Sequence, residues 1–462
     1  MRRNLLVVAA AVTALIASAV PPATASSAVR ASAGSTAIVT SVSCASAGNC
    51  AAGGYYFDAS FHAHGFVLTE RNGRWGRAIE VPGLAALRPR YASINSVSCA
   101  PAGGCAAGGY YYSQGTSQRY HAFVTNEQNG RWSRLTTVFS ARTVVSDIIG
   151  VGSVSCPAPG SCAAGGGPQP FRVSEVHGRW GRAIRLPAKD KHGNVVVSCA
   201  SAGKCAAGWD RFVVSERNGR WGKPAPVPGL AALGKGATIT SVSCTSAVSC
   251  AAGGDYVRAS GAMEVFVANE RNGRWGKAIE VPGFTALNQE GTGDLAAVSC
   301  ISAGNCVAGG DYAAPADFAG GVFEAFVAVE RNGRWGKAFE VPGIPPPSTG
   351  VCQPESDSCV AGRVLSVSCA RGGHCAVGGW YDTTQIVGQV AFVASYTNGR
   401  WSKVMQIPGL KSRGAVKSSQ VSSVSCTQSG SCAAGGIYSQ VGPAFVVDEK
   451  NGSWGQAQRV RF

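Results

Sequence analysis

One pattern recurs eight times along the chain. Its first copy begins at Ser41 with SVSC, continues through a second cysteine into AAGGYY, and ends at Gly83 after ERNGRWGRAIEVPG. The copies are 43 to 69 residues apart. This period is typical of propellers and other arrays, whose units bury their apolar faces only against each other. The copies are marked by their first cysteines, Cys44, Cys99, Cys156, Cys199, Cys244, Cys300, Cys369 and Cys426, and by their tryptophans, Trp75, Trp132, Trp180, Trp221, Trp275, Trp335, Trp401 and Trp454.

Each copy has the pattern of four short strands, which we name A to D. An Asn-Gly pair between two alternating apolar runs is a strong hairpin signal, and it stands between strands C and D. Only 14% of residues are charged and 62 are Gly, as expected for short, closely packed strands. We therefore predict an all-β fold, an eight-bladed β-propeller of four-stranded antiparallel blades, each built by one repeat. In the first copy the expected strands cover 38–44, 50–56, a run through Phe66 and Val67 to Asn72, and 75–83.

The order TSVSC-x-SAG-x-CAAGG resembles the inner two strands of a WD-repeat blade, and the blade pattern is also similar to that of sialidase-like propellers. The W-D and G-H signatures of WD repeats are missing, as is the S-x-D-x-G-x-x-W box of sialidase-like repeats. His121-Ala122-Phe123 looks like the H-A-F motif of secreted bacterial repeats. The resemblance implies a secreted bacterial β-propeller and no particular activity.

The cysteines form pairs with a fixed spacing. Eight pairs read C-x5-C, and the remaining Cys352 and Cys359 read C-x6-C. Structural zinc sites prefer tighter spacings and mix in histidine, which does not accompany these pairs. We therefore expect local disulfides between the first two strands of each blade, each contributing about 2 kcal/mol in the chain-entropy model. The C-x5-C pairs are Cys44/Cys50, Cys99/Cys105, Cys156/Cys162, Cys199/Cys205, Cys244/Cys250, Cys300/Cys306, Cys369/Cys375 and Cys426/Cys432.

The first 25 residues have the pattern of a secretory signal peptide. Arg2 and Arg3 precede an apolar run from Leu5 to Val20, and a small-x-small cleavage site follows at 23–25. Residues 26–35 are expected to be a disordered lead-in, and 36–462 a single propeller domain with an insertion at 344–363. No later apolar run is long enough to span a bilayer. Together with the cysteines, this predicts a secreted, extracellular protein.

Charge suggests a form for the turn between strands C and D. A two-residue loop would place Arg71 directly opposite Arg74, whereas a three-residue loop with Gly73 in the left-handed conformation would place Glu70 there. We therefore predict the three-residue loop. The Glu and the Arg recur in nearly every copy, which indicates structural pairs within each hairpin.

One end of the propeller should carry variable loops and an aromatic rim. The B–C segments differ between copies, and variable loops on a rigid frame are common binding sites. A tyrosine follows the second cysteine by six residues in most copies, and such rings suit stacking on sugars, although packing against the next blade explains them as well. Trp209 and Trp380 lie outside the repeated series and are the stronger ligand candidates. The candidate ligand-binding residues are Tyr56, Tyr111, Tyr256, Tyr312, Trp380, Tyr381, Tyr438, Asp255 and Asp311.

The opposite end is cationic. An arginine precedes seven of the eight tryptophans, and Arg or Lys stands two residues after seven of them. A basic ring of this kind suits an anionic polymer, although a solvated surface partly neutralised by the repeated glutamates is the alternative. The candidate polyanion-binding residues are Arg74, Arg131, Arg179, Arg220, Arg274, Arg334 and Arg400; the second series is Arg77, Arg134, Arg182, Lys223, Lys277, Lys337 and Lys403.

The sequence offers no clear catalytic constellation, and we expect no catalytic residue, cofactor or metal. His62 and His64 lie in the first B–C loop, but no carboxylate pair stands near them in sequence and Asp58 is the closest acid. Asp255 and Asp311 occupy equivalent corners, which lie far apart in an eight-fold ring. Recognised nucleophile, zinc and phosphate-loop motifs are absent.

These observations favour a secreted binding propeller that recognises cell-envelope or environmental glycan on its variable face. The alternatives are an extracellular carbohydrate-active enzyme and a structural adhesin whose basic face binds polyanions. The expected partners are glycan or anionic cell-wall polymer, with no specific nucleic acid and no membrane span, and the protein is expected to be a monomer.

Overall fold

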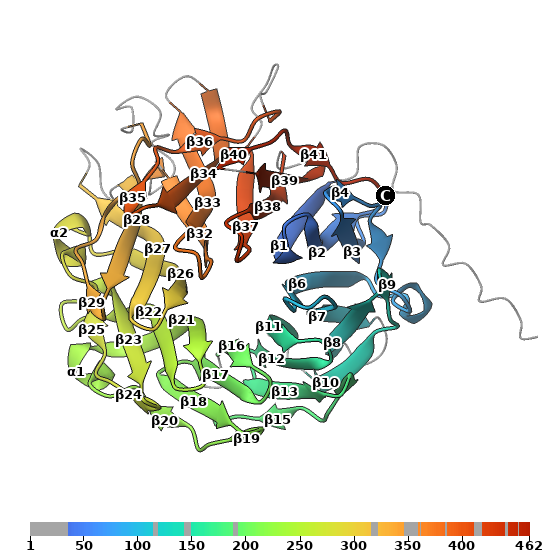
Figure 1. The fold of residues 1–462 in the computed structure, drawn as a ribbon, viewed down its shortest axis with the longest axis horizontal. Helices are drawn as coiled ribbons and strands as arrows, with labels where there is room; N and C mark the ends of the chain where they lie inside the picture. Colours follow the sequence, from blue (N-terminus) through green and yellow to red (C-terminus); the bar gives the residue numbers. More distant parts are fainter. Residues whose placement is uncertain are drawn as a thin grey trace, which may run out of the picture.

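The computed structural model arranges β-sheets as a ring around a central axis, the arrangement of a β-propeller (Figure 1). It describes residues 36–113, 119–142, 149–187, 193–315, 322–345, 359–360, 362–383, 386–410, 418–438, 442–450 and 452–462. The expected signal peptide, the lead-in, Cys352 and most of the 344–363 insertion lie outside these residues.

Each repeat contributes strands A, B and C and a fourth strand in two pieces. The A strands are β1 (Ala37–Ser46), β6 (Tyr91–Cys99), β11 (Gly150–Ala158), β16 (Val196–Ser201), β21 (Lys235–Ser246), β26 (Gly293–Ser302), β32 (Gly362–Cys369) and β37 (Gln420–Cys426). The B strands are β2 (Asn49–Phe57), β7 (Cys105–Ser113), β12 (Ser161–Gly167), β17 (Lys204–Trp209), β22 (Ser249–Val257), β27 (Asn305–Ala314), β33 (Cys375–Thr383) and β38 (Cys432–Ile437). The C strands are β3 (Ala63–Arg71), β8 (Arg119–Gln128), β13 (Phe171–Val176), β18 (Phe212–Arg217), β23 (Met263–Arg271), β28 (Val322–Arg331), β34 (Ile386–Thr397) and β39 (Ala444–Lys450).

The fourth strand begins at the tryptophan and resumes a few residues later. Its first pieces are β4 (Arg74–Trp75), β9 (Arg131–Trp132), β14 (Arg179–Trp180), β19 (Arg220–Trp221), β24 (Arg274–Trp275), β29 (Arg334–Trp335), β35 (Arg400–Trp401) and β40 (Ser453–Trp454). Its second pieces are β5 (Ile79–Glu80), β10 (Thr136–Arg142), β15 (Ile184–Arg185), β20 (Ala225–Pro226), β25 (Ile279–Glu280), β30 (Phe339–Glu340), β36 (Met405–Gln406) and β41 (Gln458–Arg459). The remaining elements are β31 (Cys359–Val360), η1 (Ala85–Leu87), α1 (Leu230–Leu233) and α2 (Phe284–Leu287).

All four expected strands are present, but strand D is interrupted. Within a repeat, neighbouring strands pair antiparallel. At the interruption, a backbone N–H turns away from its own sheet and bonds to the preceding repeat: the N–H of Ala278 donates to Pro228 O and that of Ala338 to Pro282 O, both at 2.8 Å. The break in strand D therefore links neighbouring sheets. Among the described sheets, none combines strands from the two ends of the chain, as predicted. The first two repeats, however, are joined in one sheet, because β3 pairs in parallel with β6 at Ala63 and Tyr91.

The SVSC motif joins the A strands of successive repeats. Strand A is innermost in the ring (Figure 1), so its free edge would leave backbone N–H groups unpaired. The hydroxyl of Ser243 accepts the N–H of Cys300 in the next repeat at 3.0 Å, and that of Ser241 accepts the N–H of Val298 at 2.9 Å. Equivalent serine-to-cysteine bonds link all successive repeats, and the last, from the Cys44 N–H to Ser425, returns to the first repeat.

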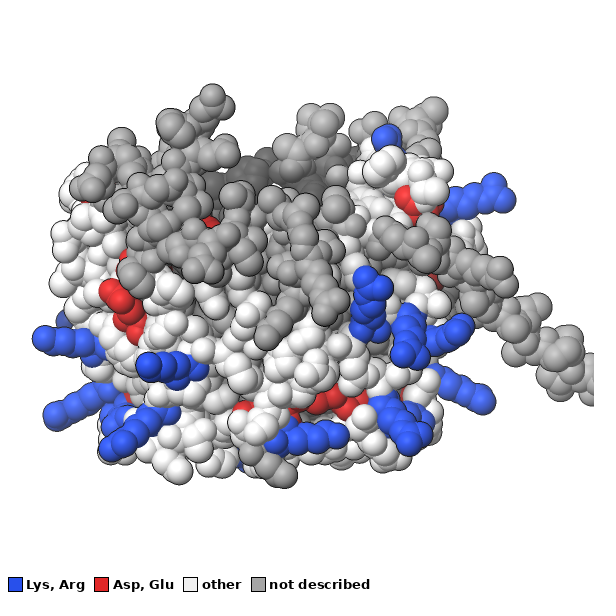
Figure 2. All heavy atoms as spheres, turned by 90° about the horizontal axis from the view of Figure 1, so that it is seen from above, with Lys and Arg blue, Asp and Glu red and all other residues white. Residues whose placement is uncertain are grey.

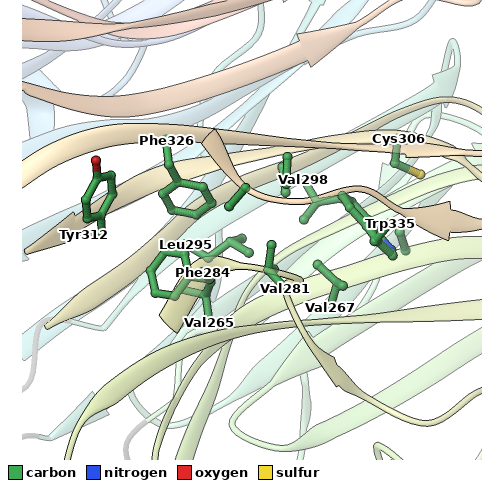
Figure 3. Close-up of a cluster of buried hydrophobic side chains, with 14 residues drawn as sticks. Val265, Val267, Val281, Phe284, Leu295, Val298, Cys306, Tyr312, Phe326 and Trp335 are labelled. Carbon is green, nitrogen blue, oxygen red and sulfur yellow. The ribbon is translucent and has the colours of Figure 1, made fainter. Parts of the chain in front are cut away.

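The hydrophobic core lies between neighbouring sheets. Figure 3 shows one such layer, in which Phe284 and Val265 from one repeat face Leu295 and Phe326 from the next. The first glycine of the Gly-Gly pair in strand B allows neighbouring sheets to approach closely, because a Cβ on Gly253 would lie 2.6 Å from the Val298 side chain. Repeats therefore stabilise one another, as expected for an array whose single unit cannot bury its own face.

The disulfides confirm the cysteine pairing. All eight C-x5-C pairs are bonded across the A–B turn, with Cα–Cα separations of 3.9 to 4.2 Å. The three helices found in the described residues each have three or four residues and lie between strands D and A, where Leu84, Leu230 and Phe284 are buried. None of these helices in the described ranges approaches the length needed to cross a membrane.

Candidate functional site on the hairpin face

The turn between strands C and D has two residues, so the predicted three-residue loop is wrong. Arg71 pairs directly with Arg74, and Glu70 pairs with Trp75. Asn72 and Gly73 both have positive φ, at 50° and 74°, which is the geometry of a type I′ hairpin turn. Two successive residues with positive φ recur in the C–D turns of the second to the seventh repeats.

The repeated glutamate is not paired with the arginine of its own hairpin. It is buried in every described repeat that carries it, with 1 to 5% of its surface exposed. In most of these repeats it instead bonds to the preceding repeat: Arg217 Nη2 lies 3.3 Å from Glu270 Oε1, and Ser215 Oγ donates to the same oxygen at 2.7 Å. Arg71 bonds Glu127 in the same way, at 3.3 Å. Arg71, Arg217 and Arg271, which we call the Arg71 series, are thus each neutralised by the glutamate of the next repeat, which removes in these hairpins the charge conflict that led to the wrong prediction.

These paired arginines lie over the next hairpin turn. A Cβ on Gly273 would lie 2.2 Å from Arg217 Nη2, and one on Gly333 would lie 2.1 Å from Arg271 Nη2. Arg271 also donates to the Gly333 carbonyl at 2.6 Å. The turn glycine is therefore required both for its left-handed backbone and for the close approach of the neighbouring guanidinium.

The seven predicted polyanion-binding arginines have a different environment. All seven are exposed. Within the described part of the chain, none of their side chains has a hydrogen bond or an ion pair, in contrast to the Arg71 series. Lys and Arg side chains project along the lower half of the side seen in Figure 2. These seven arginines are Arg74, Arg131, Arg179, Arg220, Arg274, Arg334 and Arg400.

The second basic series stands beside the first. The Cβ and Cγ atoms of Lys277 and Lys337 lie against the Pro-Gly turns of the preceding repeats, at Gly229 and Gly283. Both lysines are exposed, so the apolar stems are packed while the ammonium groups face water. This packing fixes where the second charge of each hairpin lies.

Two grooves occupy equivalent positions between neighbouring hairpins. Groove 2/3, between the second and third repeats, encloses about 780 Å³, and groove 5/6, between the fifth and sixth, about 470 Å³. Each is lined by both cations of one hairpin and by the Arg-Trp pair of the next. In groove 2/3 these residues are Arg131, Arg134, Arg179 and Trp180; in groove 5/6 they are Arg274, Lys277, Arg334 and Trp335.

An asparagine that precedes the buried glutamate also lines each groove. Asn126 accepts the Trp180 indole N–H at 2.9 Å through its Oδ1, and its amide donates to Glu175 at 2.5 Å. In groove 5/6, Asn269 donates to Glu330 at 2.5 Å. The lining thus combines three unpaired cations with an amide and an indole, and it holds no histidine, serine–base pair or acid that would act as a catalyst. This chemistry suits the binding of anionic groups.

The variable end differs from the predicted aromatic rim. Tyr56, Tyr111, Tyr256 and Tyr312 are buried, with 1 to 7% exposed, so their rings offer no free face for stacking on a ligand. The hydroxyls of Tyr111, Tyr256 and Tyr312 bond within the protein, as when Tyr312 donates to Glu324 at 2.6 Å. These four tyrosines therefore fit the alternative interpretation, in which the rings pack inside the protein.

The two tryptophans outside the repeated series are also buried. Trp380 is 7% exposed, and Trp209 is 0% exposed and donates to Pro187 O at 2.8 Å. Both lie in the core, so neither is the exposed ligand platform that the sequence predicted. Tyr381 and Tyr438 are half-buried.

The predicted acids at this end are perturbed. Burial, together with the charge of Asp294, raises the pKa of Asp255 to about 7. Burial likewise raises the pKa of Asp311 to about 7, although Arg363, 3.6 Å away, opposes the shift. Asp294 is the cross-strand partner of Asp311 and stands electrostatically close to Asp255. Sequence analysis did not single out Asp294 or Arg363, because neither lies in a repeated position of strand B.

One other cluster has the composition of a metal site without its chemistry. His374 lies close to the sulfur atoms of Cys426 and Cys432. These two cysteines form a disulfide, so they offer no thiolate. The His374 ring instead meets Glu449 through Nε2 and Thr397 through Nδ1, both at 3.1 Å. We interpret this cluster as structural.

No protein-family model matches the chain, and no curated protein matches its sequence. Several solved structures are similar in shape. An ulvan lyase bound to -[GlcA(1-4)Rha3S]- is 8% identical, with a TM-score of 0.42 over 92% of this chain and 94% of its own. YCF48 bound to a D1 peptide is 11% identical, with a TM-score of 0.35 over 66% and 81%. A six-bladed fucose-binding lectin from Aleuria aurantia is 11% identical, with a TM-score of 0.29 over 52% and 80%. At such scores we draw no functional inference from them.

Proposed function

We propose that this protein is an exported, eight-bladed β-propeller that binds an anionic glycan or cell-envelope polymer along its hairpin face. Export is supported by the signal-like first 25 residues and by the disulfide in every repeat. Eight blades are supported by the eight serine-to-cysteine links that return to the first repeat. Residues 36–462 then form one domain.

The observation that carries the proposal is the contrast between the two arginine series. The Arg71 series is neutralised by buried glutamates of the next repeat, so its charges belong to the fold. The Arg74 series lies beside it on the same hairpins, exposed and without an ion-pair partner in the described residues. Two cations of one hairpin, such as Arg274 and Lys277, line the same groove without an ion-pair partner in the described residues. They repel each other, so a polymer that brings anions to this face relieves that repulsion as well as forming new ion pairs.

The test is binding to dextran sulfate, with uncharged dextran as the neutral probe, at low and high salt. We expect the protein to bind dextran sulfate only, with an affinity that falls steeply as salt rises, because binding releases counterions. Replacing Arg274 and Lys277 with Glu removes two groove cations. We expect this variant to bind at least about tenfold more weakly and with a smaller salt dependence.

The matched control reverses two exposed cations outside the grooves, Arg211 and Lys235. It changes the net charge of the protein by the same amount. If both double variants lose affinity equally, net charge alone explains binding and the groove assignment fails. If neither dextran sulfate nor dextran binds at low salt, the proposed function itself is refuted.

A second candidate is carbohydrate-active chemistry at the variable end. It is favoured by Asp255 and Asp311, whose pKa values of about 7 are suitable for a general acid at neutral pH. The test is the chain length of acidic glycans after incubation with the protein. Cleavage that is lost in Asp311→Asn would support this candidate, and unchanged glycan length would exclude it for the glycans used.

A further inference from the structure

The first B–C turn holds an oriented carboxylate. Asp58 Oδ1 accepts two backbone N–H groups, from Ser60 at 2.8 Å and from His62 at 2.9 Å. These two bonds fix the carboxylate through Oδ1, so its second oxygen, Oδ2, is available to other side chains. The turn is closed further by the Asp58 N–H, which donates to His62 O at 3.0 Å. Backbone hydrogen bonds therefore hold the Asp58 carboxylate in one orientation.

Two imidazoles meet that second oxygen. His64 Nε2 lies 3.0 Å from Asp58 Oδ2, and His62 Nδ1 lies 3.5 Å from the same atom. A tetrahedral ion with ligand bonds of about 2.0 to 2.1 Å separates neighbouring ligand atoms by about 3.3 Å. Both observed distances are close to this value, but the three donor atoms do not all lie within 4.8 Å of one another, so binding requires the His62 ring to turn toward His64. His62, whose side chain is 41% exposed, has room to adjust its ring.

The other nitrogen of His64 faces a carboxylate from a different strand. Glu80, at the end of β5, places Oε1 3.4 Å from His64 Nδ1. Metal-binding histidines commonly donate their second ring N–H to a carboxylate, which fixes the tautomer and turns the free nitrogen toward the ion. The Tyr56 ring stacks on His64 at 5.0 Å and holds its plane. Glu80 and Tyr56 thus orient Nε2 toward Asp58 and His62.

We propose that Asp58, His62 and His64 form a binding site for a divalent transition metal, with Glu80 as the positioning residue behind His64. Two imidazole nitrogens and one carboxylate oxygen are donors that suit zinc, copper and nickel. Three protein ligands leave a fourth position open to water or to an exogenous ligand. The site lies at the variable end of the first repeat and is independent of the hairpin grooves.

The second repeat contains a natural comparison. His121 is the counterpart of His64, since each pairs with the tyrosine of its own strand B and stacks on it. His121 contacts the hydroxyls of Ser113 and Ser140, at 3.2 and 2.8 Å. No acid contacts it in the described residues. The fold therefore places a histidine at this position twice, but only the first repeat surrounds it with acids and a second histidine.

The experiment is a zinc titration of the untagged, chelator-treated protein by calorimetry, with cobalt absorption as a second readout of the donor set. We expect one saturable site per chain in the wild type. His62→Ala, whose side chain is exposed and outside the core, should weaken zinc binding at least about tenfold, and Glu80→Gln should weaken it about 10- to 100-fold. His121→Gln should bind zinc as the wild type does.

Three results would overturn the proposal. The first is the absence of saturable zinc binding by the folded wild type. The second is zinc binding by His62→Ala with unchanged affinity, and the third is an equal loss in His121→Gln. Thermal unfolding of each variant without metal shows whether a loss reflects the site or the fold.

Discussion

The junction between the last and first repeats places two acids together. Asp448 occupies the position that Ser215 or Asn269 holds in other repeats, next to the buried Glu70 of the first. Trp75 Nε1 donates to Asp448 at 3.2 Å, while neither oxygen of Glu70 has a hydrogen-bond partner of its own in the described structure. Burial, and then the charge of Asp448, raises the pKa of Glu70 to about 8.

This shift has a definite sign for stability. The ordinary pKa of Glu70 is 4.5, so between pH 4.5 and about 8 the unfolded chain releases a proton that the folded protein keeps. Stability is therefore lost as pH rises through that window. At 1.36 kcal/mol per pKa unit the full difference is about 5 kcal/mol for an isolated group. Because Glu70 and Asp448 titrate as a coupled pair, the difference is divided between them, and we expect about 2 kcal/mol from Glu70 itself.

The perturbation is Glu70→Gln. The amide remains neutral at every pH and can donate to Asp448, so it keeps the junction contact without the cost of ionisation. We expect the variant to match the wild type at pH 5 and to exceed it by about 2 kcal/mol at a pH of about 8.5. Chemical denaturation at a series of pH values measures this difference.

Glu270→Gln is the matched control. Glu270 holds the equivalent place but is bonded by Ser215 and Arg217. Its replacement leaves Arg217 without a charged partner, so we expect a loss of about 1 to 3 kcal/mol. A gain in stability for Glu70→Gln and a loss for Glu270→Gln would show that the effect at Glu70 comes from the junction between the last and first repeats. The reasoning is refuted if Glu70→Gln is less stable than the wild type at high pH, or equally stabilised at pH 5.

Three further substitutions test the fold and the variable end. Ser243→Ala removes the acceptor for the Cys300 N–H and should cost about 1 kcal/mol by chemical denaturation. Gly273→Ala, at φ 73° and against Arg217, should cost about 1 to 3 kcal/mol; an unchanged unfolding midpoint would contradict the left-handed turn. Asp255→Asn should make stability fall less than in the wild type as pH rises from 3.8 to about 7, because burial and Asp294 raise the pKa of Asp255; identical pH profiles would argue against that environment.

The strand order and the disulfides could be predicted because they depend on contacts within one repeat. The cysteine spacing determined each A–B bridge, and the Asn-Gly pair located each C–D turn. The turn type was missed because it depends on the next repeat. Arg71 opposite Arg74 is unfavourable in an isolated hairpin, but Glu127 from the neighbouring sheet neutralises Arg71.

The candidate sites show the same division between local and inter-repeat information. The exposed arginines before the tryptophans were found because they recur. The burial of Tyr56 and Trp380 could not be predicted, because an aromatic residue at the end of strand B has the same sequence pattern whether its ring faces a neighbouring sheet or solvent. Glu80 lies 16 residues from His64, and only the folding of strand D back along strand C brings the two together.

The cationic path around the hairpin face is interrupted at one place. The last repeat carries Ser453 and Gln456 where the others carry their two groove cations, and the neighbouring junction is lined by Asp448. A groove needs the cations of one hairpin and the Arg-Trp pair of the next. The last repeat can supply neither, so its grooves with the seventh repeat and with the first each lack one half of the motif. An anionic polymer bound to this face would therefore follow an open arc over the first seven repeats, with fixed ends at the junction that closes the ring. Replacing groove cations in the middle of this arc should divide it into two shorter binding segments, whereas replacing Arg77 beside the junction should only shorten it. Long and short dextran sulfate chains would then respond differently to the two changes, because only a long chain gains from a continuous arc.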